Sequence, residues 1–362
     1  MNFIIIQNSV KTTLIFRVGY IKELLKHGNV IVIAPNDDDK SKRKLESMGV
    51  VVEKVSTNRL ISIIHMNYFI SKYRFKKKTS FICHFLITFL MCYPSLIPFN
   101  RKLIIYTEGL GSLFAKKTIF RYLLRFLLIH NHAVRLFCNQ SEKQFIGKKS
   151  DIVTNGIGIE LEKFIKKSSI PSKNYYRLLY IGRLINDKGI RDAINAFRII
   201  SSIRSDVVLT LVGDIYPNNP SSLNANDIQL LKSEFNSNIE FVGFTENVLD
   251  WYHSSDILLL PSIREGFPVC VMEASSVGIP TIGYNVPGVR DAIRSGENGE
   301  LVKFKDVNGI AEKVLSLLNT NKLTSYIERA NTYAKNNFSS QEKNAQILKI
   351  LLDFNTGSKY QI

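Results

Sequence analysis

Short apolar runs alternate with segments of helical period through the first half of the chain. Residues 3–7, 29–35 and 50–55 are runs rich in Ile and Val, and residues 13–28 and 40–49 between them have the spacing of helices. Strands that are apolar at nearly every position are typical of a parallel sheet covered by helices on both faces. The pattern predicts an α/β domain with a doubly wound sheet.

The same alternation starts again in the second half, after the polar and aperiodic residues 166–177, which we interpret as a linker. Each apolar run there ends in a small or polar loop, which is where ligands bind in doubly wound sheets. The runs are residues 177–184, 207–214, 239–244, 256–262 and 280–285. For a chain of 362 residues we therefore predict two domains, residues 1–170 and 171–336.

Two segments of the first half are unusually apolar. Residues 81–99 contain no Lys, Arg, Asp or Glu and could span a bilayer, but two prolines interrupt them, which favours a buried strand and helix. Residues 118–137 place three arginines within a wide apolar face. That pattern fits a helix lying on a membrane surface or a core helix with a basic outer stripe, and the sequence leaves both open.

The chain is strongly basic, with 48 Lys and Arg against 31 Asp and Glu and a net charge of +17. Unless this is compositional drift, it indicates an anionic partner: a nucleic acid, a membrane surface or a small molecule. Residues 71–78 and 116–149 are the most basic segments. No zinc-finger, homeodomain or RNP pattern accompanies them, so we expect no nucleic acid partner.

The cysteines and the N-terminus indicate the compartment. Cys83, Cys92, Cys138 and Cys270 form no C-x-x-C pair and have no His at ligand spacing, which favours buried thiols over a disulfide or a metal site. Residues 1–11 become polar too soon for a secretory signal peptide and instead predict a first strand. We therefore expect a cytoplasmic protein.

A candidate anion site follows the apolar run at residues 256–262, where a short helix begins. Pro268 stands at the expected first helical position, which suits its fixed φ and its missing N–H group. The amides of residues 269–271 would then be free at the start of the helix, where they could bind a phosphate. Gly266 would let the backbone approach a ligand closely.

Two carboxylates frame this helix start. Glu265 precedes it and Glu273 lies about one turn inside it, so both could face the same ligand. Because a carboxylate only accepts hydrogen bonds, two of them beside a phosphate site suit the hydroxyls of a ribose and of a sugar. The alternative is a purely structural helix with one surface Glu and one packed Glu.

A second loop supplies cations. Arg183 and Lys188 follow a buried strand, with Gly182 and Gly189 beside them and a helix beginning near Gly189. The two cations and the helix dipole would converge on negative charge. Alone this loop could be basic turn surface, but together with the Glu-bearing loop it predicts a diphosphate site flanked by sugar-binding acids.

At this point the chain resembles the retaining glycosyltransferases of family 4. The similarity rests on five stretches in the family's order: residues 154–164, 180–189, 242–244, 262–293 and 337–351. The resemblance implies the GT-B fold, α/β with two facing Rossmann-like doubly wound domains and a cleft between them. It also implies that residues 337–362 form a final helix that crosses back to the first domain.

The resemblance also implies roles for the residues above. Arg183 and Lys188 match residues that hold the donor diphosphate and support its departure, Glu265 matches the acid on the transferred sugar, and Glu273 matches the acid on the ribose hydroxyls. The remaining implied donor-binding positions are Gly182, Val242, Gly243, Gly266, Phe267, Pro268, Val269 and Cys270. No cofactor or metal is implied, and the anomeric configuration is expected to be retained.

The first domain departs from the family pattern. Many members have a His in the loop that residues 106–112 occupy, whereas this chain offers Glu108. Glu108 could contact the acceptor or the sugar in catalysis, or it could face solvent. His84 could face the cleft, or it could be a strand histidine whose hydrogen bonds are satisfied.

Members with similar openings look like bacterial enzymes that assemble O-antigen or capsular polysaccharide. The implied reaction moves a sugar from a nucleotide-sugar donor, UDP-linked in our expectation, to a polyprenyl-diphosphate-linked glycan. The implied location is the inner face of the plasma membrane, where the basic first half would meet anionic lipid. The alternatives are a GT-B-fold nucleotide-sugar epimerase, an inactive donor-binding partner subunit and a membrane-associated structural protein.

Overall fold

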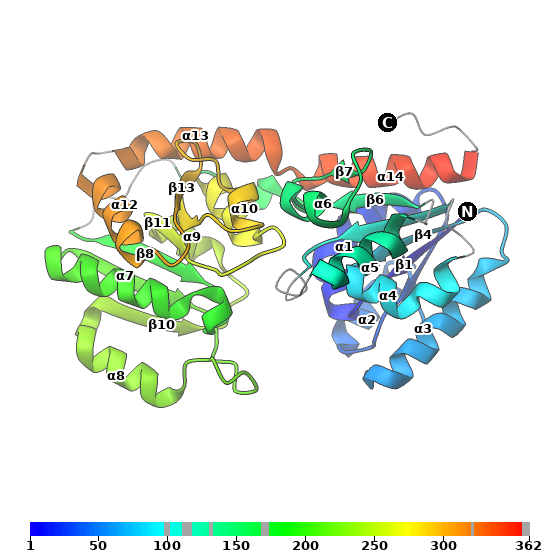
Figure 1. Cartoon of the computed structure of the whole chain (residues 1–362), viewed down its shortest axis with the longest axis horizontal. Helices are drawn as coiled ribbons and strands as arrows, with labels where there is room; N and C mark the ends of the chain where they lie inside the picture. Colours follow the sequence, from blue (N-terminus) through cyan, green and yellow to red (C-terminus); the bar gives the residue numbers. More distant parts are fainter. Residues whose placement is uncertain (98–101, 111–117, 130–132, 168–173, 320–321, 357–362) are drawn as a thin grey trace. The chain divides into compact units, whose positions relative to one another are not determined.

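The computed structural model describes residues 1–97, 102–110, 118–129, 133–167, 174–319 and 322–356. The chain forms two compact units (Figure 1). Unit 1 comprises residues 1–157 and 340–362, and unit 2 comprises residues 158–339. Each is an α/β unit built on a parallel sheet, as the alternating pattern predicted.

Unit 1 contains a seven-stranded sheet in the order β3-β2-β1-β4-β5-β6-β7. Its elements are β1 (Asn2–Ile6), α1 (Val10–Leu25), β2 (Asn29–Ile33), α2 (Asp39–Ser47), β3 (Val51–Val52), α3 (Arg59–Arg74), β4 (Thr79–His84), α4 (Leu86–Leu96), β5 (Leu103–Thr107), α5 (Thr118–Ile129), β6 (Val134–Phe137), α6 (Gln140–Ile146), β7 (Ile152–Val153) and α14 (Ser340–Thr356).

Unit 2 contains a six-stranded sheet in the order β10-β9-β8-β11-β12-β13. Its elements are η3 (Leu161–Lys163), β8 (Tyr176–Ile181), η4 (Asn186–Lys188), α7 (Ile190–Ile203), β9 (Val207–Val212), α8 (Ala225–Phe235), η5 (Asn236–Asn238), β10 (Ile239–Gly243), α9 (Leu249–Ser254), β11 (Ile257–Leu260), α10 (Val269–Val277), β12 (Thr281–Tyr284), α11 (Val289–Ala292), β13 (Gly299–Val302), α12 (Val307–Asn319) and α13 (Lys322–Asn337).

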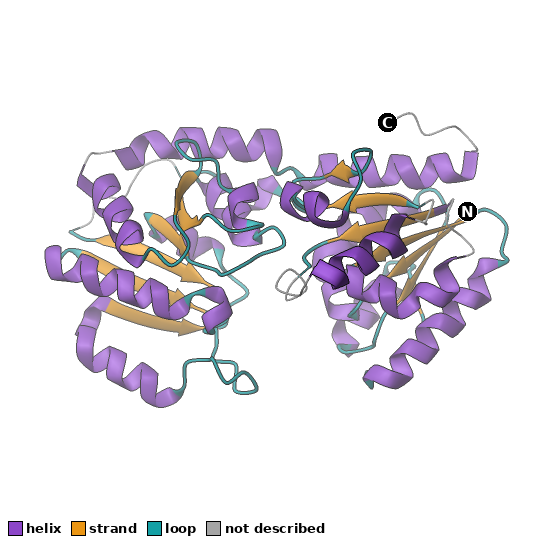
Figure 2. Ribbon diagram, in the orientation of Figure 1, coloured by secondary structure: helices purple, strands orange, loops and turns teal. Residues whose placement is uncertain are grey.

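The continuous apolar runs are strands buried on both faces. In β1 the side chains of Phe3, Ile4, Ile5 and Ile6 are all fully buried, although successive residues of a strand point to opposite faces. The helices of each unit supply the cover on those faces (Figure 2). The prediction of doubly wound parallel sheets is therefore confirmed for both units.

In both sheets the strand order reverses beside the first strand of the unit. β1 lies between β2 and β4, and β8 lies between β9 and β11. Ligands of doubly wound sheets bind beyond the carboxyl ends of the strands at such a reversal. The loops after β1 and β4 in unit 1, and after β8 and β11 in unit 2, are therefore the places to look for a site.

The structure divides the chain about a dozen residues before the predicted boundary at 170/171. Residues 158–167 already belong to unit 2, because Ile159 pairs with Ser339, the Lys167 amide donates to the Val277 carbonyl, and Ser276 donates to the Phe164 carbonyl. The boundary between the units therefore lies before the polar segment at residues 166–177 and not within it. Residues 168–173 of the predicted linker lie outside the described residues.

The described part of the apolar segment at residues 81–99 contains a strand followed by a helix, β4 and α4, as favoured from its prolines, and residues 98 and 99 lie outside the described residues. Within the described ranges, no helix combines the length and apolarity needed to cross a bilayer. Residues 118–137 form α5 and β6, and positions 130–132 between them lie outside the described residues. The four cysteine thiols are free, and three of them are buried.

The final helix returns to unit 1, as expected. α14 packs against α1 and β4, and a Cβ atom added at Gly19 of α1 would lie 2.5 Å from the Asn344 side chain of α14. Gly19 therefore allows the close approach of these two helices. The predicted return at residue 337 and the observed one at Ser340 differ by three residues.

Candidate active site

A pocket of about 260 Å³ opens at the carboxyl ends of β8 and β11, where the strand order of unit 2 reverses. It is lined by Ile181, Gly182, Lys188, Leu260, Ser262, Glu265, Phe267, Pro268, Val269 and Cys270. Seven of these ten residues were predicted from the two loops. The other three, Ile181, Leu260 and Ser262, are at or just beyond the ends of the two strands, and that position was the signal that could have found them.

Gly189 fixes the loop that carries Lys188. The loop forms the short helix η4 and ends at Gly189. The φ of Gly189 is +74°, a conformation that residues other than Gly rarely adopt. A Cβ atom there would lie 1.9 Å from the Pro261 carbonyl oxygen at the end of β11. The cation-bearing loop therefore lies directly against the strand that leads to Glu265.

The loop that carries Glu265 is held from two sides. The Ile263 amide donates to the Asp187 carbonyl at 3.0 Å, and the Glu265 amide donates to the Pro287 carbonyl at 3.2 Å. Gly288, at φ +80°, leaves room for this loop, because a Cβ atom there would be 2.0 Å from the Glu265 carbonyl oxygen. Sequence reasoning gave this supporting glycine no role.

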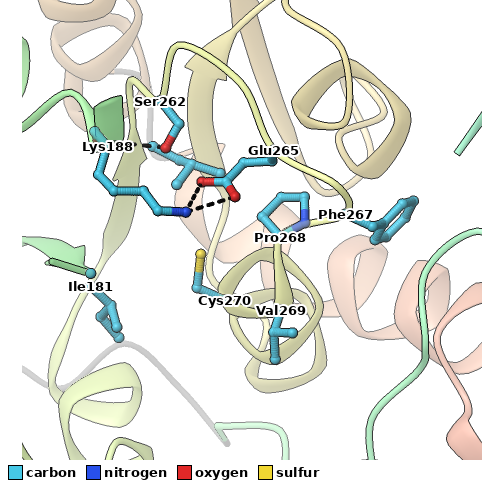
Figure 3. Close-up of a pocket in the computed structure, with 10 residues that line it drawn as sticks. Ile181, Lys188, Ser262, Glu265, Phe267, Pro268, Val269 and Cys270 are labelled. Atoms are coloured by element: carbon cyan, nitrogen blue, oxygen red, sulfur yellow. Dashed lines mark hydrogen bonds and ion pairs between the residues drawn. The ribbon is translucent and has the colours of Figure 1, made fainter. Parts of the chain in front are cut away.

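Lys188 and Glu265 form an ion pair across the pocket. The ammonium donates to both carboxylate oxygens at 2.6 and 2.8 Å, and Figure 3 shows it reaching from one loop to the other above the start of α10. The side chains retain 27% and 12% of their exposure, so solvent and a ligand can reach the pair. The pocket thus presents a cation and an acceptor close enough to serve one polar ligand.

The start of α10 supplies the second source of positive charge. Its N-cap residue, Pro268, offers no side-chain hydrogen bond to the first turn, and Val269 and Cys270 line the pocket. Helix amides in this position favour an anion. The amide of Val271 is a correction to the prediction: it donates to the Pro268 carbonyl at 3.2 Å and is not free.

The other predicted donor-binding residues lie outside the lining of this pocket. Arg183 stacks its guanidinium 5.3 Å from the ring centroid of Tyr216, and Val242 packs on an apolar cluster. The Gly243 carbonyl accepts from the Gly213 amide at 2.8 Å. Gly266 is in the loop between the lining residues Glu265 and Phe267.

Glu273 lies one turn inside α10, next to the buried Tyr252. The Tyr252 hydroxyl donates to the Glu273 carboxylate at 2.7 Å. Burial raises the pKa of Glu273 above its ordinary value, and the hydrogen bond from Tyr252 opposes that rise in pKa. The carboxylate is thus a partly buried acceptor with one partner already in place.

In unit 1 a buried charge network lies at the ends of the neighbouring strands β4 and β5. Glu108, which follows β5, forms an ion pair with Arg17 of α1, and its other oxygen lies 2.5 Å from His84 Nδ1 at the end of β4. His84 Nε2 is 2.6 Å from the Tyr20 hydroxyl. The side chains of Arg17, His84 and Glu108 are 2%, 0% and 6% exposed. Of the alternatives for Glu108, the solvent-facing one is wrong, and His84 is a strand histidine with its hydrogen bonds satisfied.

Burial dominates the titration of this network. It lowers the pKa of His84 to about 4, with a further lowering from the Arg17 charge, so the imidazole is neutral at pH 7. The pKa of Glu108 is also lowered, because Arg17 and His84 together outweigh the effect of burial on the carboxyl group, which would raise it. The network therefore holds one full cation and one full anion within the core of unit 1.

Comparisons with known proteins find a family match within the second unit. Residues 162–336 match the family described as "Glycosyl transferases group 1". These residues, just under half of the chain, are thus similar to that family. The matched range contains the whole pocket and both loops of the Lys188–Glu265 pair, so the resemblance inferred from the motifs is confirmed over this range.

Two of the relatives are bacterial glycosyltransferases. The chain is 31% identical over 208 residues to the capsular polysaccharide biosynthesis glycosyltransferase CapM of Staphylococcus aureus, and the match spans 54% of each protein. It is 26% identical over 339 residues to N,N'-diacetylbacillosaminyl-diphospho-undecaprenol alpha-1,3-N-acetylgalactosaminyltransferase of Campylobacter jejuni, covering 85% of this chain and 87% of that one. The chain thus spans about half the length of the first relative and most of the second.

The fold recurs in solved structures. Anabaena HepE in complex with UDP superposes with a TM-score of 0.80 at 16% identity, over 98% of this chain and 100% of that one. A sucrose-phosphate synthase from Thermosynechococcus elongatus gives a TM-score of 0.79 at 15% identity, over 99% and 100%. The predicted GT-B class, with two Rossmann-like α/β domains, is therefore confirmed.

Proposed function

We propose that this chain is a retaining glycosyltransferase that moves a sugar from a UDP-linked donor to a lipid-linked glycan in the synthesis of a bacterial surface polysaccharide. The observation that carries the proposal is the Lys188–Glu265 pair at the uncapped start of α10, at the strand-order reversal of a group 1 glycosyl transferase domain. The CapM and Campylobacter relatives support the polysaccharide setting, and HepE, crystallised with UDP, supports the donor.

Lys188 would neutralise the diphosphate as the bond between the sugar and the diphosphate breaks. A cation held in place before the reaction stabilises the charge of the leaving group without having to reorganise. Arg183, five residues before Lys188, would add a second cation, and the amides of Val269 and Cys270 would bind phosphate oxygens. The proposal needs no metal ion, because these groups supply the positive charge.

Glu265 would accept hydrogen bonds from hydroxyls of the transferred sugar, and Glu273 from those of the ribose. Gly182 and Gly266 would let the donor approach the backbone, and Val242 and Gly243 would lie against the base. The acceptor, a polyprenyl-diphosphate-linked glycan, would be met at the inner face of the plasma membrane by unit 1. The undecaprenol diphosphate in the name of the Campylobacter relative supports this class of acceptor.

Isothermal calorimetry with UDP and with GDP tests the donor site. Wild type should bind UDP more tightly than GDP, and Lys188→Ala should lose most of that affinity. Lys313→Ala is the matched control, because Lys313 also pairs with a carboxylate, Glu300 at 3.1 Å, away from the pocket. Equal UDP binding by the two variants, or none by folded wild type, would overturn the proposal.

Transfer itself is tested with UDP-sugars and membranes that contain the native acceptor. A radiolabelled sugar should move into a lipid-extractable product and release UDP. Conversion of the sugar without an acceptor would identify an epimerase instead. UDP binding without turnover in such membranes would identify an inactive donor-binding subunit.

A further inference from the structure

The outer face of α3 in unit 1 is apolar, although nothing within the described residues covers it. Leu60, Ile64 and Tyr68 recur every fourth residue and are 74%, 68% and 65% exposed, and Phe75, just beyond the helix, is 82% exposed. Residues three and four apart on a helix share a face, so these side chains form one stripe. We call these four residues the α3 stripe.

The opposite face of α3 anchors the helix in the unit. Ser62, Met66, Ile70 and Tyr73 are buried, and α3 packs against α4, beside which it lies in Figure 1. The Asn67 side chain donates to the Met91 carbonyl of α4 at 3.0 Å. The helix is therefore apolar on both faces: one face belongs to the core, and the α3 stripe is presented outward.

The charge around the stripe is predominantly positive. Between positions 54 and 141 the chain has fourteen Lys and Arg residues and a single carboxylate, Glu108, which is buried against Arg17. The cations nearest to the stripe gather at the end of α3 and just beyond it: Lys72, Arg74, Lys76, Lys77 and Lys78. Among them Lys72 pairs with a carboxylate, Glu53, at 2.8 Å.

We propose that the α3 stripe and the cations that follow it dock unit 1 onto a membrane rich in anionic lipid, with α3 lying in the plane of the interface. A helix with apolar side chains facing the acyl region and Lys or Arg at headgroup level has the chemistry that such surfaces bind. The stripe enters the acyl boundary, and the lysines contact the lipid phosphates.

The other possible occupants fit less well. A second copy of the same face would bring like charges together, which opposes association. A nucleic acid would satisfy the cations but would leave Leu60 and Ile64 exposed to water, since aliphatic side chains neither pair with phosphates nor stack on bases. A lipid surface buries the apolar stripe and neutralises the charge at once.

This surface deepens the proposed function and rests on it, because a lipid-linked acceptor gives the docking its purpose. α5 repeats the pattern within the same unit: Tyr122, Leu123 and Phe126 are 63%, 53% and 58% exposed and lie among arginines. This favours the first of the two interpretations of residues 118–137. The docking surface that can be tested most cleanly is α3, whose side chains are described along its whole length.

Vesicle sedimentation of the full-length chain tests the proposal. Wild type should sediment with vesicles of phosphatidylcholine and phosphatidylglycerol and much less with phosphatidylcholine alone. Leu60→Ser/Ile64→Ser should weaken binding to the anionic vesicles by about tenfold or more. The matched control is Ile203→Ser/Leu230→Ser in unit 2, which removes the same residue types at 64% and 70% exposure and should bind as wild type does.

A fluorescence reporter locates the contact. Tyr68→Trp should shift its emission to the blue on anionic vesicles and should be quenched by brominated acyl chains, whereas Leu230→Trp should show neither effect. Equal sedimentation of the two double variants, or binding that ignores lipid charge, would overturn the proposal. So would association of wild type with itself in place of vesicles.

UDP calorimetry on the same proteins separates this inference from the proposed function. Loss of vesicle binding with intact UDP binding in Leu60→Ser/Ile64→Ser supports both. If wild type binds vesicles but not UDP, the docking surface is supported and the donor site is rejected. If wild type binds UDP but not vesicles, the donor site is supported and the docking surface is rejected.

Discussion

Both sheets place an ion pair beyond the carboxyl ends of neighbouring strands, but the two pairs have different surroundings. In unit 2 the ends of β8 and β11 carry Lys188 and Glu265, which line an open pocket. In unit 1 the ends of β4 and β5 carry His84 and Glu108, which are sealed against Arg17. Unit 2 leaves its charges within reach of a ligand, and unit 1 uses them to join α1 to the sheet.

The difference in exposure sets what each pair contributes. A partly exposed ion pair adds little to stability, so Lys188 and Glu265 can exchange each other for a ligand at small cost. A buried pair has lost its hydration, and removal of one partner leaves an uncompensated charge in the core. We therefore expect substitutions of the Lys188–Glu265 pair to affect activity and substitutions of the Arg17–Glu108 pair to affect folding.

The largest expected effect is on folding, at Arg17. Arg17→Met should lower the free energy of unfolding by about 3–5 kcal/mol, because it leaves the Glu108 carboxylate buried without its cation. Urea denaturation followed by circular dichroism measures the change. Arg17→Met/Glu108→Gln should regain much of the loss, since the stranded charge is then gone. A double variant no more stable than Arg17→Met would contradict this account.

The partners of this network show why sequence reasoning stopped short in unit 1. Arg17 and Glu108 are 91 positions apart, and Tyr20 and His84 are 64 apart, so no local spacing connects them. An Arg within a helical pattern predicts a solvated side chain, since lone arginines are rarely buried. Glu108 was singled out from its loop, but the cation that makes it a core residue could not be predicted.

Unit 2 was more accessible to prediction because its site is assembled from two local segments. The loop at Lys188 and the loop at Glu265 each follow an apolar strand, and parallel topology brings adjacent carboxyl ends together. The sequence could not show why Gly is needed at positions 189 and 288 to hold these loops in place. That need arises because each glycine lies against the backbone of the Glu265 loop or of the strand before it, and such contacts depend on the tertiary structure.

The next effect in size is on transfer, at Glu265. Glu265→Gln should reduce the rate of transfer by about 100- to 1000-fold, the cost typical of removing one preorganised polar contact to a reacting group. Its free energy of unfolding should change by less than about 1 kcal/mol, because the pair with Lys188 is partly exposed. Glu300→Gln, in the matched pair with Lys313, should keep wild-type transfer. A large loss of stability in Glu265→Gln would erase the contrast between the two pairs.

A smaller effect should appear as a pH dependence of stability, from His84. The folded pKa is about 4 against an ordinary value of 6.5, so between these limits the unfolded chain binds a proton that the folded chain does not. Stability contributed by His84 is fully present above pH 6.5 and is lost as the pH falls toward 4, by roughly 3 kcal/mol at most.

Denaturation of wild type and His84→Gln at several pH values measures this contribution as a difference. The difference in free energy of unfolding between the two proteins should narrow as the pH falls from 6.5 toward 4. The matched control is His27→Gln, because His27 is exposed. If this difference in free energy of unfolding stays constant between pH 6.5 and pH 4, burial does not hold His84 neutral.

The smallest effect is expected at Tyr252. It tests whether Glu273, which does not line the pocket, contributes to donor binding. Tyr252→Phe removes the hydrogen bond that lowers the pKa of Glu273, so that pKa should rise further. If the Glu273 carboxylate binds the ribose, UDP affinity should fall by a few fold at pH 7, since one hydrogen bond contributes about 0.5–1.5 kcal/mol. The loss of UDP affinity should grow as the pH is lowered, because a protonated carboxyl group accepts hydrogen bonds less well than a carboxylate.

The matched control is Tyr284→Phe, which removes a similar hydrogen bond to Asp192 at 2.9 Å. UDP affinities of the two variants that stay equal across the pH range would make Glu273 a packed residue of α10, and the donor site would then end at the pocket around Lys188 and Glu265.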